Sequence, residues 1–178
     1  MLGEGRRDGT VVVVKTHNAG MLSYDKAVLI YRHPKETVLA EYNRLGTHQD
    51  HVGTLSADEL LNNANMTLVN ILINAWDVKN SEWILRYSKP LHIISYYDLQ
   101  NDLAGTMTRM LEFLQWGVSE NQIRCITEDY EGLFHRTKKT VTPEQFFSKA
   151  QLERMESIVE NFRGLIIKRH AKGLPLSL

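Results

Sequence analysis

The sequence predicts an α/β fold in which helices cover a mainly parallel sheet. Three short runs are rich in strand-forming residues, and the second and third are each followed directly by a helical pattern. Strands that alternate with helices favour parallel pairing, with ligands beyond the carboxyl ends of the strands. The 178 residues contain no repeat and no glycine- or proline-rich linker, so we expect one domain over residues 1–178.

The predicted strands cover Thr10 to Thr16 (TVVVVKT), Ala27 to Tyr31 (AVLIY) and Leu91 to Tyr96 (LHIISY). Each run is too short for a typical helix, and the first two are rich in strand-forming residues. We therefore expect buried strands, at least in the first two segments.

Three helices are predicted between the second and third strands. Pro34 opens the first, in which apolar residues recur at helical spacing up to Gly46. Ser56, with a glutamate three residues later, is a capping-box pattern and predicts a short helix within Leu55 to Asn65. A long amphipathic pattern over Met66 to Arg86 predicts a helix that packs through its aromatic side.

Two further helical regions and a tail follow the third strand. Asp98 is expected to cap a helix that runs to about Leu114. Thr142 is expected to start a final helical region that ends near Lys168. The last residues, 174–178, are expected to form a loose tail.

Charge and hydropathy exclude several classes of partner. Twenty-one Lys and Arg balance twenty-one Asp and Glu, so there is no broad basic surface for nucleic acid or anionic lipid. Apolar runs such as Val11 to Val14 are far too short to cross a membrane, so we expect no membrane insertion by this chain. The first nine residues, MLGEGRRDG, lack the apolar stretch of a signal peptide.

Metal and disulfide chemistry are not expected either. A single cysteine, Cys125, excludes an internal disulfide and a cysteine zinc cluster, and the histidines follow no spacing typical of a metal site. Trp76 and Trp83, two helical turns apart, are expected in the core rather than on a stacking platform.

Two cations and two imidazoles follow the first two predicted strands. Lys15 and His17 end the first strand, and Arg32 and His33 follow the second. If both strands run parallel, these side chains meet at one edge of the sheet as a local anion site. Arg32 lies just before a helix whose N-terminal amides favour phosphate, and its guanidinium can bind two oxygens. His17 could act as a base beside Lys15, although a solvated side chain is the ordinary alternative.

Four segments resemble, in order, the sulfotransferases that use 3′-phosphoadenosine 5′-phosphosulfate (PAPS). They begin at Lys15 (KTHNAG), Ile30 (IYRHPKETVLAEYNR), Ile93 (IISYYDLQNDL) and Arg109 (RMLEFL). The chain is similar in particular to the sulfotransferase domain of WSC-domain-containing proteins. That likeness also includes AEYNRLGTHQDHVG, the helix with both tryptophans, and YEGLFHR, and it covers most of residues 10–160.

The resemblance implies a three-layer P-loop-like sulfotransferase fold and transfer of a sulfuryl group from PAPS to a hydroxyl without a metal. His17 matches the base that deprotonates the acceptor, and Lys15 matches the lysine near the sulfuryl group. For the cofactor, Arg32 matches the arginine that holds the 3′-phosphate, and Tyr96 matches a tyrosine near the adenine.

Later basic residues are a second candidate for the same phosphate. Arg136 with Lys138 or Lys139 lies near the family's late basic segment, without its usual glycine-rich form, and a solvated charge cluster is the alternative. The serine that the family places eight residues after the phosphate-binding arginine is here Ala40, so one hydroxyl contact is missing.

The family's phosphosulfate loop should precede the first strand, and its motif does not occur in this chain. We therefore expect an N-terminally truncated domain, a fragment or degenerate copy, whose activity alone the sequence leaves open. The rival function is a non-catalytic interaction domain. A kinase needs a glycine-rich loop with Lys and Ser or Thr, which is absent. The resemblance further implies a carbohydrate acceptor on a glycan and a Golgi location, with the membrane anchor supplied by sequence outside this chain.

Overall fold

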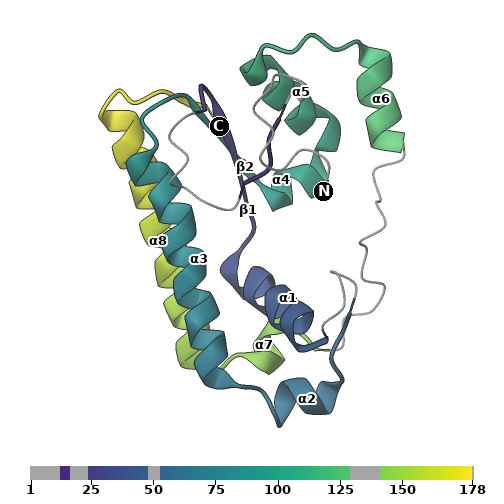
Figure 1. The fold of residues 1–178 in the computed structure, drawn as a ribbon, viewed down its shortest axis with the longest axis vertical. Helices are drawn as coiled ribbons and strands as arrows, with labels where there is room; N and C mark the ends of the chain where they lie inside the picture. Colours follow the sequence, from purple (N-terminus) through teal and green to yellow (C-terminus); the bar gives the residue numbers. More distant parts are fainter. Residues whose placement is uncertain (1–12, 17–23, 48–52, 129–140, 178) are drawn as a thin grey trace.

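The computed structural model describes residues 13–16, 24–47, 53–128 and 141–177 (Figure 1). Within these ranges three strands form one sheet in the order β1-β2-β3, and both strand pairs are parallel. The strands are β1 (Ala27–Tyr31), β2 (Leu91–Ser95) and β3 (Leu176–Ser177). The helices are α1 (Pro34–Thr47), α2 (Ala57–Leu61), α3 (Met66–Arg86), α4 (Tyr96–Asn101), α5 (Leu103–Leu114), α6 (Glu120–Glu128), α7 (Pro143–Phe146) and α8 (Lys149–Ala171).

Helices lie on both faces of the sheet, which gives three layers. Figure 1 shows α3 and α8 side by side on one side of the strands, with α4, α5 and α6 on the other. Side chains of β2 alternate between these layers, because successive residues of a strand point to opposite faces. Leu91 and Ile93 join the core with α3 and α8, whereas the ring of His92 stacks on Phe113 of α5, with 5.2 Å between centroids.

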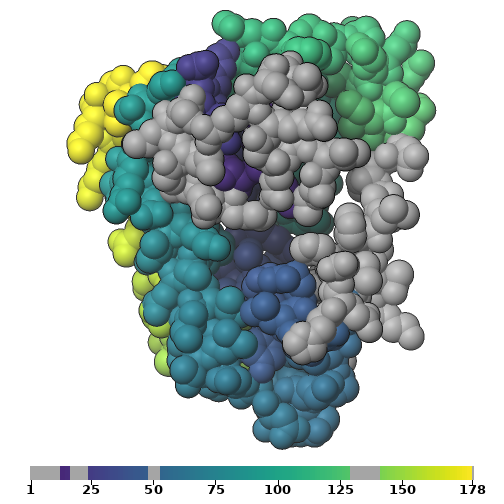
Figure 2. All heavy atoms as spheres, viewed as in Figure 1, coloured from purple at the N-terminus to yellow at the C-terminus, as the bar shows by residue number. Residues whose placement is uncertain are grey.

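The main core lies between the sheet and the α3–α8 pair. Phe162 of α8 is fully buried, and the rings of Tyr31 and Trp76 pack on it at centroid distances of 5.0 and 5.7 Å. The core therefore joins the end of β1 to both long helices. In Figure 2, the α1–α2 region and the α5–α6 region form opposite ends of the molecule.

Several predictions are confirmed. The strand over Ala27 to Tyr31 and the helix over Met66 to Arg86 have the expected bounds, and α1 begins at Pro34. Ser56 caps α2 with the expected capping box. Trp76 is buried, and Trp83 is partly buried against the same core, as expected for core residues.

The strand predicted over Thr10 to Thr16 is wrong for the residues that the structure describes. Residues 13–16 have no regular secondary structure, and Val13 is 57% exposed. A β-branched run expresses only a local preference, and a strand also needs a pairing partner. Residues 10–12 lie outside the described ranges.

Two predicted helical regions are each divided by a second cap. Ser95, not Asp98, caps α4, and Asp102 caps the separate helix α5. The region expected from Thr142 likewise consists of α7 and α8, because Ser148 caps α8 with its own capping box. Helix α6 was not predicted.

The tail expected to be loose instead adds a strand. Leu176 and Ser177 form β3, which pairs with Leu91 and His92 of β2. The partners are far apart in the sequence, so local pattern could not indicate the pairing. Leu178 lies outside the described residues.

Candidate functional site

The carboxyl ends of β1 and β2 meet at one edge of the sheet. Tyr31 is in register with Ser95, so Arg32 and Tyr96 are the first residues beyond two neighbouring strands. Parallel strands bring such residues together, as the sequence predicted for a ligand site. The Arg32 guanidinium carbon lies 4.8 Å from the centre of the Tyr96 ring.

The guanidinium of Arg32 is held on two sides. The Tyr96 ring lies against it as a cation–π contact, and Nε donates to Oε2 of Glu36 at 2.7 Å. The Arg32 side chain is 35% exposed. Its terminal nitrogens Nη1 and Nη2 have no hydrogen-bond partner among the described residues. The edge that can bind two anion oxygens is therefore open.

The backbone of Arg32 is fixed from a distant helix. Its carbonyl oxygen accepts from Nε1 of Trp76, on α3, at 2.9 Å, and from the Thr37 hydroxyl at 3.2 Å. Because Trp76 is buried in the main core, its indole ties the start of α1 to that core. The position of the Arg32 side chain thus depends on packing 44 residues away in the chain.

The first turn of α1 does not offer the amides that the sequence analysis expected for phosphate. The amides of Glu36 and Thr37 both donate to the carbonyl of His33, and the Lys35 amide donates to Nδ1 of the His33 ring. Pro34 has no amide hydrogen. The expectation of free amides is wrong because His33 satisfies them, so the Arg32 side chain is the candidate for an anion here.

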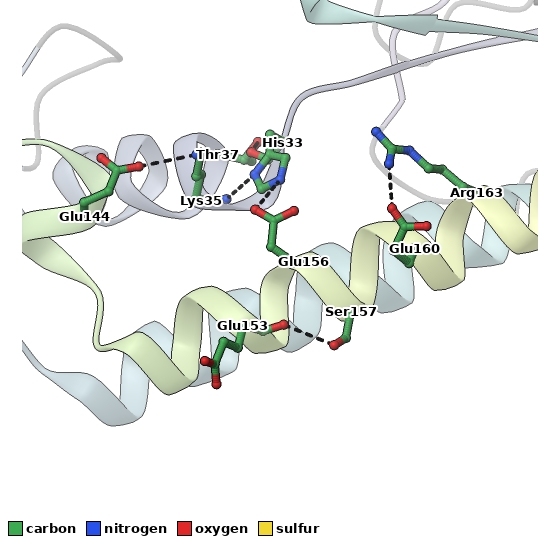
Figure 3. A network of polar contacts seen from close by, with 9 residues as sticks. All are labelled: His33, Lys35, Thr37, Glu144, Glu153, Glu156, Ser157, Glu160 and Arg163. Atoms are coloured by element: carbon green, nitrogen blue, oxygen red, sulfur yellow. Dashed lines mark hydrogen bonds and ion pairs between the residues drawn. The ribbon is translucent and has the colours of Figure 1, made fainter.

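His33 is an anchor of α1 rather than a base (Figure 3). Its Nδ1 accepts from the Lys35 amide, and its Nε2 lies 3.4 Å from Oε1 of Glu156 on α8. Both ring nitrogens are engaged, so neither is left to accept a proton from a substrate. A second cross-link is formed nearby by Lys35 and Glu144 of α7, at 3.4 Å. These contacts give His33 a structural role at the start of α1.

The side chain before Arg32 points into the core. Tyr31 packs on Phe162, and burial raises the pKa of its hydroxyl. The group therefore stays neutral near pH 7. Alternation along the strand end thus places an apolar, uncharged ring in the core and the guanidinium of Arg32 at the edge.

The structure brings together only part of the predicted site. Arg32 and Tyr96 are in contact. The resemblance implied that Tyr96 lies near the adenine, and in the structure its ring lies against the Arg32 guanidinium. Lys15 is exposed within a segment without regular secondary structure. His17, Arg136, Lys138 and Lys139 lie outside the described residues, so their roles stay predictions.

Sequence reasoning missed two residues of the site. Glu36 lies four positions after Arg32, which is the spacing of an ion pair within a helix and could have been recognised. The hydrogen bond from Trp76 to the Arg32 carbonyl leaves no sequence signal, because a core tryptophan shows only its apolar character.

Two absences concern the described ranges alone. In them, no group of three His, Cys, Asp or Glu side chains is placed to hold a metal ion. None of the helices there is both long enough and apolar enough to cross a membrane.

Comparison with known proteins gives one family and several relatives. The model of the sulfotransferase domain matches residues 13–153. WSCD family member GA21586 of Drosophila pseudoobscura pseudoobscura is 28% identical over 165 residues, which cover 88% of this chain and 52% of that protein. WSCD family member AAEL009094 of Aedes aegypti is 30% identical over 142 residues, which cover 76% of this chain and 44% of that protein. WSCD family member CG9164 of Drosophila melanogaster is 26% identical over 165 residues, which cover 89% of this chain and 50% of that protein.

The chain spans about half the length of these curated relatives. No solved structure matches it. The parallel sheet with helices on both faces agrees with the α/β, P-loop-like fold of the matched domain.

Proposed function

Because the chain belongs to the sulfotransferase domain family, we propose that it binds PAPS and takes part in transfer of the sulfuryl group to a hydroxyl, on a carbohydrate. The sulfotransferase assignment rests on the family, and the donor and acceptor are the proposal. The similarity to WSCD family members supports the same subfamily that the sequence motifs indicated.

The observation that carries the donor assignment is the open edge of Arg32. A guanidinium held through Nε and stacked on Tyr96 presents Nη1 and Nη2 in the geometry that suits two oxygens of a phosphate. The donor set therefore fits the 3′-phosphate of PAPS or of its product, adenosine 3′,5′-bisphosphate. Ala40, in α1, supplies no hydroxyl, so Arg32 carries more of the contact than it would beside a serine.

The proposed reaction is an in-line transfer between two oxygens. The bond from sulfur to the donor's phosphate oxygen breaks with its electron pair left on that oxygen, and a bond from sulfur to the acceptor oxygen forms. His17 takes the acceptor's proton, and Lys15 stabilises the negative charge that develops near the transferred group. Positioning and charge stabilisation, rather than a covalent intermediate, then account for the rate.

The acceptor and the compartment follow from the resemblance to WSC-domain-containing proteins. We propose a glycan hydroxyl as the acceptor and the Golgi as the location. Neither is needed for the test of the nucleotide site, which concerns this chain's own residues.

The test is thermal unfolding of the purified chain with adenosine 3′,5′-bisphosphate. A ligand that binds only the folded state raises the unfolding temperature with the logarithm of its concentration above Kd. We expect such a rise in the parent, a much smaller rise in Arg32→Ala, and little rise with adenosine 5′-monophosphate, which lacks the 3′-phosphate.

Arg44→Ala is the matched control, because Arg44 lies on α1, which Arg32 precedes, and pairs with Glu41. It should respond to the nucleotide as the parent does. A folded parent without any shift would contradict the donor assignment and favour the rival, a non-catalytic interaction domain.

A further inference from the structure

We propose that Glu36 is a positioning residue for nucleotide binding, which holds Arg32 by its inner nitrogen so that its terminal edge faces the phosphate. The inference rests on the proposed function, since the phosphate is that of the proposed nucleotide. It assigns a role to a carboxylate that would otherwise appear unfavourable beside an anion site.

The geometry separates the inner and outer sides of the guanidinium. Among the hydrogen bonds of Arg32, Glu36 accepts from Nε alone, at 2.7 Å, and not from Nη1 or Nη2. A carboxylate that bound a terminal nitrogen as well would occupy the edge that phosphate needs. Glu36 thus orients the group without blocking it.

A second ion pair, within α1, shows the alternative. Glu41 accepts from both Nε and Nη2 of Arg44, at 2.8 and 2.6 Å, so two of its guanidinium nitrogens are occupied. Arg32 and Arg44 are similarly exposed, at 35% and 36% of the side chain. The two arginines therefore differ in how many guanidinium nitrogens the glutamate binds, and not in their exposure to water.

The position of Glu36 suits this role. It lies in the first turn of α1, where the helix dipole favours a negative charge, and its amide is bonded to the His33 carbonyl. The carboxylate is therefore fixed to a rigid backbone. A free arginine side chain has many rotamers, and their loss on binding weakens affinity, so an arginine that is already oriented binds phosphate more tightly.

Glu36 also brings a negative charge near the phosphate, and two substitutions separate charge from orientation. Glu36→Gln removes the charge but keeps an oxygen that can accept from Nε. Glu36→Ala removes both. The comparison of Gln with Ala therefore measures orientation alone, because neither carries the charge.

The experiment is calorimetric titration of adenosine 3′,5′-bisphosphate into the parent and both variants. We expect Glu36→Gln to bind at least as tightly as the parent, and Glu36→Ala to bind about 3- to 10-fold more weakly than Glu36→Gln, the range for one side chain ordered on binding. For adenosine 5′-monophosphate, the dissociation constants of Glu36→Ala and Glu36→Gln should be nearly equal. Glu41→Gln, the matched control, should bind as the parent does.

Equal dissociation constants for Glu36→Gln and Glu36→Ala would overturn the positioning role. The same would follow if the ratio were unchanged with adenosine 5′-monophosphate, because the effect would then not involve the 3′-phosphate.

A second measurement tests the role without nucleotide. In heteronuclear NMR, the Nε–H of Arg32 should be rigid on the nanosecond timescale in the parent and in Glu36→Gln, and mobile in Glu36→Ala. A mobile Nε–H in the ligand-free parent would overturn this inference. A rigid Nε–H in a parent that binds no nucleotide would instead contradict the proposed function, and with it the nucleotide as the ligand, while Glu36 would still orient Arg32.

Discussion

Single residues decide what the carboxyl edge of the sheet can bind. Arg32 was predicted as an anion-binding residue from its place between a strand and a helix, and that place is confirmed. Its contacts with Glu36 and Tyr96 set which edge of the guanidinium is open. The sequence could not indicate that His33 would use the amides of α1, because this depends on the rotamer of one imidazole.

The hydrogen bond from Trp76 to the Arg32 carbonyl gives the first prediction. Trp76→Phe keeps an aromatic ring against Phe162 but leaves the carbonyl without its 2.9 Å partner. We expect a loss of about 1 kcal/mol in the free energy of unfolding, the typical value of one hydrogen bond, measured by urea denaturation. Nucleotide affinity should fall as well, since the Arg32 backbone is less fixed.

Trp83→Phe is the control, because Trp83 is partly buried against the same core and makes no hydrogen bond to Arg32. If Trp83→Phe lowered nucleotide affinity as much as Trp76→Phe, the hydrogen bond would not be the cause.

The buried imidazole of His92 predicts a pH dependence. His92 is only 2% exposed, its Nδ1 has no partner among the described residues, and burial lowers its pKa. In the unfolded chain the His92 imidazole binds a proton near pH 6.5, whereas in the folded chain it does so only at lower pH. In the pH range between the two pKa values, unfolding therefore takes up a proton. Stability should therefore fall as the pH drops below about 6.5.

Urea denaturation at several pH values between 5 and 7.5 measures this dependence. The slope of the free energy of unfolding against pH should be smaller in His92→Gln than in the parent. It should be unchanged in the control His170→Gln, because His170 is exposed. An unchanged slope in His92→Gln would show that other groups cause the dependence.

At the scale of elements, caps determine where the helices begin. The cap formed by Ser56 and its glutamate can be recognised from the sequence, whereas the caps at Ser95, Asp102 and Ser148 lie at or within longer apolar patterns. The apolar spacing continued across these positions, so periodicity alone favoured one helix in each case. Ser95 starts α4 directly at the end of β2, and Tyr96, the first residue of α4, lies beside Arg32.

The N-cap of α8 gives a prediction at this scale. The hydroxyl oxygen of Ser148 accepts from the backbone amide of Gln151, and the side-chain oxygen of Gln151 accepts from the backbone amide of Ser148. Ser148→Ala should lower the free energy of unfolding by about 1 kcal/mol, as loss of an N-cap does, measured by urea denaturation. Ser157→Ala, within the same helix and exposed, should change it by less than about 0.5 kcal/mol. Equal effects would contradict the capping role.

At the scale of the whole molecule, one buried guanidinium joins the long helices to the sheet's far edge. Arg169 of α8 is 2% exposed and donates to the carbonyls of Ile84, Tyr87, Lys89 and Pro175. These carbonyls belong to the end of α3, the approach to β2 and the approach to β3. The parallel α/β class was predictable from alternating patterns, whereas this long-range contact and the strand β3 were not.

Arg169→Met tests that connection. The methionine fills part of the space but leaves buried carbonyl groups without partners, so we expect a loss of about 2 to 4 kcal/mol in the free energy of unfolding. Amide hydrogens of Leu91 and His92, next to β3, should exchange faster. Arg163→Met removes an exposed pair with Glu160 and should cost at most about 1 kcal/mol. A similar small loss for Arg169→Met would contradict its role as the link between these parts.

We propose that the neighbouring ends of β1 and β2 form a nucleotide phosphate site around Arg32. The most direct measurement is a crystal structure of the chain with adenosine 3′,5′-bisphosphate. We expect the 3′-phosphate within hydrogen-bond distance of Nη1 and Nη2 of Arg32, with Glu36 still bonded to Nε. A nucleotide bound elsewhere, or one whose 3′-phosphate makes no contact with Arg32, would contradict it.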